Sequence, residues 1–378
     1  MGSPIHFRTP RFPEFEVSEY IQRVTRAQRM MADTGLDAML LTTPNPLRYF
    51  AGGPLTGLFE DAFNTFFLLL PADPGTDTTL VMSSGREGAC QTSWVPDQRF
   101  WGYDTDASLM SQQKSLDFVA ETVREKGLGN AKIGAELDAG LRIGMTQREF
   151  GKLRELLPEV RWESCSSIVW QVAEIKSEAE LSRIRRAAEI TNHAFRRAFE
   201  SAHVGMTEKE LASIIYQSYF EQGATGTGFL AVLSGRERGI WADALPSDYV
   251  MKKGDFLMMD GGCQVDGYIA DISRMGSFGE PSDKDRRLYE VAREANASAV
   301  AAVKPGVEIR ELFAAGQKPF MDAGLGDLLV FGRGQLGHGI GLSLHEYPDL
   351  SSGSTKKLQP GRVIAIEPAI SDHPMWAE

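Results

Sequence analysis

Residues 256–274 read Phe-Leu-Met-Met-Asp-Gly-Gly-Cys-Gln-Val-Asp-Gly-Tyr-Ile-Ala-Asp-Ile-Ser-Arg, and they carry the clearest structural signal in the sequence. Apolar segments flank the Asp-Gly step at 266–267, a pattern typical of the tight turn in a β-hairpin. Asp260 follows three apolar residues, and Asp271 lies inside the second apolar segment. An ionised carboxylate in a core strand costs free energy unless it is paired or bound to a cation. The pattern therefore favours either two aspartates that share a divalent metal or an aspartate paired with a neighbour such as Arg274.

Two later motifs place further candidate ligands in apolar surroundings. Residues 337–348 read Gly-His-Gly-Ile-Gly-Leu-Ser-Leu-His-Glu-Tyr-Pro, so glycines flank His338, and His345 follows seven residues later. Glycine lets the backbone approach closely and adopt unusual φ angles, which suits a ligand loop, although a lone histidine is more often a core residue. Residues 361–368 read Gly-Arg-Val-Ile-Ala-Ile-Glu-Pro, so Glu367 closes an apolar run. Two Asp, one His and one Glu form an oxygen-rich set that suits Mn, Fe, Co or Zn.

The first half of the chain alternates helical and strand patterns, which predicts an α/β domain. Turn-forming residues fill positions 44–53, between the first two predicted strands. The predicted helices cover 20–32, ending near Gly35, and 114–126, and the predicted strands cover 37–42, 63–70, 78–82 and 132–136.

The second half begins with a long charged helix. Ser177 and Glu180, three residues apart, predict a capping box at its start, and Thr207 with Glu210 repeats the device. The pattern then reads helix, helix, strands, helix, helix, strands, which predicts an α+β domain with antiparallel strands. The boundary falls between 171 and 177, so we expect domains at 1–172 and 173–378.

Length and composition narrow the function classes. A chain of 378 residues is longer than one core usually supports, which agrees with two domains. Cys90, Cys165 and Cys263 lie far apart and form no paired motif, so we expect a reducing cytoplasm. A net charge of -11 argues against a nucleic-acid partner. No segment approaches the about 18 apolar residues of a membrane span, and the N-terminus lacks the pattern of a secretory signal.

Taken in order, these motifs resemble those of the pita-bread metallopeptidases, a superfamily that includes Xaa-Pro dipeptidases (prolidases), Xaa-Pro aminopeptidases and methionine aminopeptidases. The helix start Ile-Lys-Ser-Glu at 175–178 and the turn-rich segment at 44–53 resemble the creatinase-type N-terminal domain of its two-domain members. The resemblance covers nearly the whole chain. It implies an α/β creatinase-like N-terminal domain, 1–172, and an α+β pita-bread catalytic domain, 173–378.

The resemblance also implies a role for each matching residue. Asp260, Asp271, His338 and Glu367 match four of the five metal ligands of the family. His345 matches the histidine that contacts substrate and steadies the tetrahedral intermediate. In that chemistry a bridging hydroxide attacks the scissile carbonyl and a metal-bound carboxylate, for which we take Glu367, shuttles the proton. The family further implies two divalent ions (Mn, Co or Zn) and a homodimer in which the N-terminal domain of one subunit borders the active site of the other.

One departure from the family concerns the fifth ligand, a Glu on a strand about a dozen or more residues beyond the Glu-Pro step. This sequence ends at Glu378, eleven residues after Glu367. We therefore expect the catalytic domain to lack its last strand here. The alternative is that Glu378 serves as the fifth ligand through a shortened loop.

A second departure lies before the hairpin, where peptidases of the family carry a histidine ahead of a Ser-Asp step. No histidine occurs between His203 and His338, and the spacing puts Asp243 in that place. An ionised aspartate can only accept hydrogen bonds. Asp243 is therefore either a solvated loop residue or, with Trp241, a binding site for a cationic group on a non-standard substrate.

These features predict a metal-dependent hydrolase of small peptides or peptide-like amides, most simply an Xaa-Pro dipeptidase or aminopeptidase. The alternative suggested by Asp243 is a C–N hydrolase or lyase that acts on a small non-peptide compound. A catalytically silent binding protein on the same fold is the third hypothesis. No nucleic acid and no membrane is expected as a partner.

Overall fold

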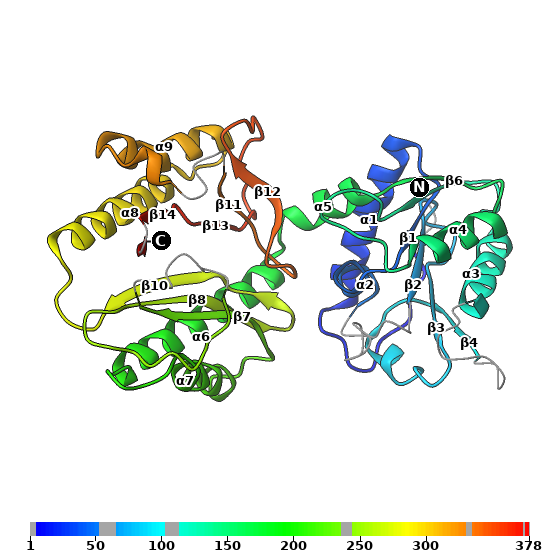
Figure 1. Cartoon of the computed structure of the whole chain (residues 1–378). Helices are drawn as coiled ribbons and strands as arrows, with labels where there is room; N and C mark the ends of the chain where they lie inside the picture. The colour runs from blue at the N-terminus through cyan, green and yellow to red at the C-terminus, as the bar shows by residue number, and fades with distance from the viewer. Residues whose placement is uncertain are drawn as a thin grey trace. The chain divides into compact units, whose positions relative to one another are not determined.

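The computed structural model describes residues 5–52, 66–102, 113–235, 244–329, 335–372 and 375–377. The chain folds into two compact units, unit 1 at Met1–Val172 and unit 2 at Ala173–Glu378. Each unit has its own sheets and helices (Figure 1). None of the helices within the described ranges has both the length and the hydropathy that a membrane span requires.

Unit 1 is built on a mixed six-stranded sheet in the order β4-β3-β2-β1-β5-β6. The pairs β1–β2 and β2–β3 are antiparallel and the other three pairs are parallel. Strands β1 to β3 are buried at every position, so they form the centre of the core. The strands are β1 Ala38–Leu41, β2 Phe67–Pro71, β3 Thr79–Ser83, β4 Asp97–Trp101, β5 Lys132–Ala135 and β6 Arg161–Ser164. The strands predicted near β1, β3 and β5 are confirmed; for β2, residues 63–65 lie outside the described part.

The helices of unit 1 are α1 Val17–Thr34, α2 Pro44–Ala51, α3 Gln113–Glu125, α4 Gln147–Leu156 and α5 Ser166–Glu174, with a short 3-10 helix, η1, at Ala89–Thr92. Residues of α3 and α4 join the strands in one apolar cluster, and α1 lies on the other side of the sheet (Figure 1). Along α1, Tyr20, Val24, Ala27 and Met31 are fully buried, as expected for one face of a helix. Gly35 ends α1 with a φ of 69°, which confirms the predicted helix and its end.

The turn predicted at 44–53 is wrong, because α2 occupies most of this segment. Pro44 suits the first turn of a helix, where its missing N–H has no partner to lose. The buried carboxylate of Glu136 accepts the backbone N–H groups of Thr42 (2.8 Å) and Thr43 (3.2 Å) and both of their hydroxyls. Burial raises the pKa of Glu136, although these four donors oppose the shift. The start of α2 is thus stabilised by the Glu136 carboxylate, which lies far along the chain. The turn-forming residues at 44–53 give no sign of this distant contact.

Unit 2 begins with two helices that cover one face of an antiparallel sheet (Figure 1). Both predicted capping boxes are confirmed, with Ser177 and Thr207 as N-caps. The sheet has the order β10-β8-β7, and β9 pairs with β8. The elements are α6 Glu178–Ser201, α7 Glu208–Glu221, β7 Gly226–Ser234, β8 Phe256–Val265, β9 Tyr268–Ile269 and β10 Ile272–Ser277.

The predicted hairpin is confirmed. Asp266 and Gly267 connect β8 to β9 with φ angles of 48° and 81°. Two successive positive φ angles are the signature of the two-residue turn that matches strand twist. Ser273 pairs with Asp260 across β8 and β10, so Asp271 lies two residues from the position opposite Asp260. The hairpin therefore brings the two aspartates to neighbouring positions of one sheet.

The rest of unit 2 is a second helix pair packed on a three-stranded antiparallel sheet, β12-β11-β13. The predicted α+β order is confirmed. The elements are α8 Asp283–Ala302, α9 Ile309–Asp322, the 3-10 helix η2 Gly326–Leu328, β11 Gln335–Gly339, β12 Glu346–Ser351, β13 Ile364–Ile366, β14 Ile370–Asp372 and β15 Met375–Ala377.

Candidate metal centre

Three of the predicted ligands meet in unit 2. Asp271 precedes β10, His338 lies on β11 and Glu367 follows β13. One ligand atom from each lies within 4.8 Å of the others. His338 Nε2 is 3.4 Å from an Asp271 carboxylate oxygen and 3.2 Å from a Glu367 oxygen. The strands fix this arrangement, because His338 pairs with Ala365 across β11 and β13, two residues before Glu367.

The contacts of the two ring nitrogens of His338 indicate what kind of ion the cluster can bind. Its Nδ1 lies 2.8 Å from the carbonyl oxygen of Gly339, which can only accept, so Nδ1 carries a proton. Nε2 of the neutral ring would then direct a lone pair at the oxygens of Asp271 and Glu367. That arrangement is repulsive unless a cation or a second proton lies between them. Burial alone lowers the pKa of His338, but the hydrogen bonds to Asp271 and Glu367 outweigh it and raise the pKa to about 10. The donor set therefore fits a divalent ion.

The glycines that flank His338 have a packing role. A Cβ at Gly337 would lie 2.1 Å from the carbonyl oxygen of Ala365, and a Cβ at Gly339 would lie 2.4 Å from that of Tyr347. Both distances are too short for any side chain. The glycines thus let β11 fit tightly between β13 and β12, whereas the sequence suggested close approach to a ligand.

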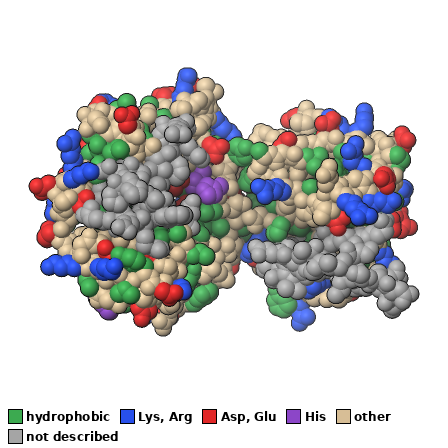
Figure 2. Space-filling model, in the orientation of Figure 1, with side chains coloured by type: hydrophobic (Ala, Val, Ile, Leu, Met, Phe, Trp, Pro, Cys, Tyr) green, Lys and Arg blue, Asp and Glu red, His purple; other side chains and the backbone are tan. Residues whose placement is uncertain are grey.

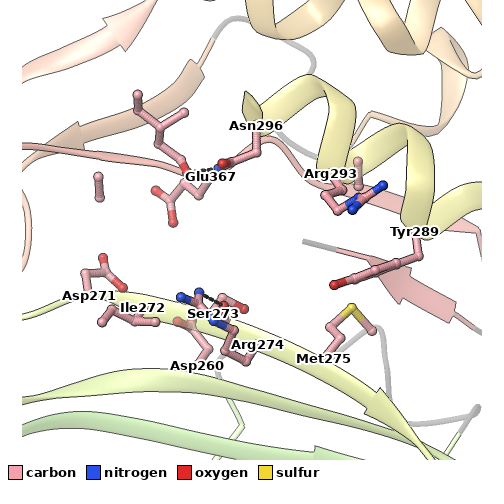
Figure 3. A pocket seen from close by; sticks show the side chains of 13 residues that line it. Asp260, Asp271, Ile272, Ser273, Arg274, Met275, Tyr289, Arg293, Asn296 and Glu367 are labelled. Atoms are coloured by element: carbon pink, nitrogen blue, oxygen red, sulfur yellow. Dashed lines mark hydrogen bonds between the residues drawn. The ribbon is translucent and has the colours of Figure 1, made fainter. Parts of the chain in front are cut away.

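Asp260 lies on β8 and lines the same pocket as Asp271 and Glu367, although it is not a member of the three-residue cluster. The pocket has a volume of about 400 Å³, and Figure 3 shows these carboxylates on its wall. Arg274, the alternative partner considered for the aspartates, donates instead to the Ser273 carbonyl (2.6 Å) and to Asn192 Oδ1 (3.2 Å).

His345 lies in the turn between β11 and β12, with its ring 4.2 Å from that of His338. It is exposed, whereas His338 is only 2% exposed. An exposed imidazole in this position can contact a molecule that enters from solvent. Trp241, Asp243 and Glu378 lie outside the described residues.

A buried ion pair supports the His345 turn and was missed by the sequence analysis. Lys176 Nζ lies 2.9 Å from a Glu346 carboxylate oxygen, with the two side chains 1% and 5% exposed. Glu346 also accepts the backbone N–H of Ser343 at 3.1 Å. A Cβ at Gly341 would lie 2.6 Å from either Glu346 oxygen, so the third glycine of the motif leaves room for this carboxylate. In the sequence, the only sign that Lys176 is buried was its position between the apolar Ile175 and the helix cap Ser177.

Models of known protein families match both halves of the chain. Residues 182–377 match the profile of metallopeptidase family M24, and residues 23–175 match the creatinase/prolidase N-terminal domain. The chain is 27% identical over 347 residues to an Xaa-Pro dipeptidase of Lactobacillus delbrueckii subsp. lactis, covering 91% of this chain and 89% of the relative. It is 32% identical over 334 residues to an uncharacterized peptidase of Staphylococcus aureus, covering 88% and 87%.

Solved structures agree in fold. An Xaa-Pro dipeptidase from Bacillus anthracis matches with a TM-score of 0.79 and 26% identity, covering 93% of this chain and 91% of that one. A prolidase from Thermococcus sibiricus matches with a TM-score of 0.82 and 25% identity, covering 95% and 92%.

Proposed function

This chain belongs to metallopeptidase family M24, and from that membership we propose that it hydrolyses Xaa-Pro peptides, as a dipeptidase or an aminopeptidase. The observation that carries the proposal is the cluster of Asp271, His338 and Glu367 beside a pocket of about 400 Å³. A space of this volume suits a short peptide. The Xaa-Pro dipeptidases among the relatives support the substrate class.

We propose that Asp271, His338 and Glu367, together with Asp260, hold two divalent ions, Mn, Co or Zn. When bound, such ions supply Lewis acidity that polarises a scissile carbonyl and activates water at neutral pH. Glu367 accepts a proton from the attacking water and delivers it to the leaving nitrogen. His345 donates a hydrogen bond to the oxygen of the scissile carbonyl, where negative charge develops.

We propose that 1–172 is the creatinase-like domain and 173–378 the pita-bread catalytic domain, which the two compact units support. We further propose a homodimer and a cytoplasmic location, the latter because Cys90, Cys165 and Cys263 are all free thiols.

A second candidate function is hydrolysis or lysis of a small non-peptide compound. It is favoured by the absence of a histidine between His203 and His338 and by Asp243 in its place. A cationic amidine or sulfonium group would suit an aspartate where a peptide carboxylate would not.

The test is to strip the protein of metal, add Mn, Co or Zn, and follow release of proline from Gly-Pro and Ala-Pro. We expect metal-dependent turnover that Asp271→Ala lowers by at least about 1000-fold, since the variant loses a ligand of the cluster. Asp266→Asn is the matched control: this aspartate lies on the same hairpin, pairs with Arg183 at 3.0 Å and does not line the pocket. Metal binding without release of proline would contradict the Xaa-Pro proposal and favour the non-peptide substrate.

A further inference from the structure

The turn between β11 and β12, which carries His345, is held by several hydrogen bonds. The carbonyl oxygen of Gly341 accepts the backbone N–H of Ile269 on β9 at 2.9 Å. The backbone N–H of Gly341 donates to the carbonyl oxygen of Ser343 at 3.1 Å. A carboxylate oxygen of Glu346, the first residue of β12, accepts the N–H of Ser343 at 3.1 Å. The backbone that precedes His345 is therefore fixed both by the hairpin and by the side chain of Glu346.

The direction of the His345 side chain is coupled to that of Glu346. At the start of a strand, neighbouring side chains point to opposite sides. Glu346 points into the interior, where its side chain is only 5% exposed. His345 is exposed, and its ring lies 4.2 Å from the ring of His338. If Glu346 left the interior, His345 would turn away from the candidate metal ligand.

The partner that keeps Glu346 in the interior is Lys176. Its Nζ lies 2.9 Å from Glu346 Oε2, whereas Oε1 accepts the N–H of Ser343, so the two carboxylate oxygens have different donors. The backbone N–H of Lys176 donates to the carbonyl oxygen of Gly361 at 2.8 Å. Gly361 precedes β13, the strand that leads to Glu367. Lys176 and Glu346 thus connect the backbone before one candidate metal ligand to the turn that carries His345.

Stability alone gives no reason for charged residues at this place. Removing two charges from water costs free energy, and well-packed apolar side chains of similar volume are often at least as stable. An apolar side chain cannot accept the N–H of Ser343. An ionised carboxylate accepts hydrogen bonds in defined directions from both donors at once. The ion pair therefore supplies a fixed geometry that an apolar contact would not.

We propose that Lys176 and Glu346 are positioning residues that hold the His345 imidazole where it contacts substrate. The inference rests on the proposed function, in which His345 donates a hydrogen bond to the scissile carbonyl oxygen. It extends that function to two residues that do not line the pocket. A donor stabilises developing charge best when it is oriented before the reaction, and a displacement of about 1 Å can lower the rate about 100-fold.

The experiment separates positioning from folding. It compares wild type, Glu346→Gln and the apolar pair, defined as Lys176→Met combined with Glu346→Leu, each with and without His345→Ala. The apolar pair leaves no buried charge, so its fold does not suffer from an unpaired ion. The matched control is Lys209→Met combined with Asp248→Leu, the same kind of replacement in an ion pair of unit 2 whose side chains are 58% and 82% exposed.

We expect the apolar pair to keep most of the thermal stability and the Mn binding of wild type. Its kcat for Ala-Pro should fall about 10- to 100-fold with little change in KM, because His345 acts on the transition state. In the His345→Ala background the same replacement should lower kcat by less than about twofold, since the side chain through which it acts is already absent. The control should behave as wild type. Equal losses with and without His345 would overturn the inference and leave the proposed function standing.

Nuclear magnetic resonance of the histidine rings gives a readout that does not need turnover. The chain has six histidines, and His345→Ala identifies the signal of His345. The nearby ring of His338 shifts this signal in wild type. In the metal-free and the Zn-loaded protein, the apolar pair should move it toward the position of an exposed histidine and leave the signal of His6 in place.

The outcomes distinguish the two proposals. If wild type does not cleave Ala-Pro but the His345 signal moves in the apolar pair, the proposed function is wrong and the positioning of His345 stands. An unmoved signal overturns the inference whether or not the peptide is cleaved. If the apolar pair does not fold, the two charges serve the fold itself, and the inference is wrong.

Discussion

At the scale of single residues, Asp97 shows how one carboxylate can join several elements. It accepts hydrogen bonds from Thr79 (3.0 Å) on β3, from Arg99 (3.1 Å) on β4 and from Lys126 (2.8 Å) after α3. Burial raises the pKa of Asp97, but these three donors outweigh it and lower the pKa below its usual value. The folded state thus favours the ionised form of Asp97 more than the unfolded state does.

Unit 1 should therefore lose stability in acid. A lowered pKa in the folded state contributes stability that is present above the unfolded pKa of about 4 and is lost as the pH falls through the folded pKa. Asp97→Asn removes this contribution. We expect the variant to be less stable than wild type at about pH 7, and we expect the difference to narrow as the pH falls to about 3. Urea denaturation at both pH values measures this, and an equal loss at both would contradict the assignment to the charge of Asp97.

The sequence revealed the candidate metal ligands better than it revealed the buried glutamates that stabilise the surrounding backbone. Asp260 and Asp271 stood out because carboxylates are rare in apolar strands. Glu136 and Glu346 are buried more deeply, at 1% and 7% exposed, but their partners lie far away in the chain. Sequence patterns report local surroundings, so a buried charge that is satisfied by a distant partner gives no local signal.

At the scale of elements, the caps and the hairpin were predictable because each is encoded within a few residues. Ser177 and Thr207 cap their helices through residues three positions on, and the Asp-Gly step sets the hairpin turn. Helix α2 was not predictable in this way, because the residues at its start donate hydrogen bonds to Glu136, which is distant in the sequence. Nor could spacing alone reveal that Arg293 and Glu367 share a pocket, because this depends on how α8 packs against β13.

The ion pair between Lys176 and Glu346 links the start of α6 to the turn that carries His345, and it gives a prediction at this scale. Glu346→Gln leaves a buried lysine without its partner, which should destabilise unit 2 by about 3–5 kcal/mol. Lys176→Met combined with Glu346→Leu should recover much of that loss, since no buried charge remains. Thermal and urea denaturation measure both. As a control, Lys209→Met removes one member of an exposed pair with Asp248 and should change stability by less than about 1 kcal/mol.

At the scale of the whole molecule, all candidate ligands belong to unit 2, although the chain has two units of similar size. Adding Mn should therefore stabilise the two units unequally. A ligand at 100 times its dissociation constant adds about 2.7 kcal/mol to the state that binds it. We expect slower hydrogen exchange in β8, β10, β11 and β13 and little change in the six-stranded sheet of unit 1. Asp271→Ala should remove the effect, and equal slowing in both units would show that metal acts elsewhere.

The order of the ligands along the chain sets the time at which the metal cluster can form during synthesis. Asp271 and Glu367 are 96 positions apart, and β13 leads to Glu367. A ribosome adding about 5–20 residues per second needs several seconds to pass from one to the other. Until β13 is made and pairs with β11, the growing chain holds its aspartates without their histidine and glutamate in place. Capture of metal by the full cluster thus follows the synthesis of β13, and a protein that holds its ion there has already completed β8, β10 and β11.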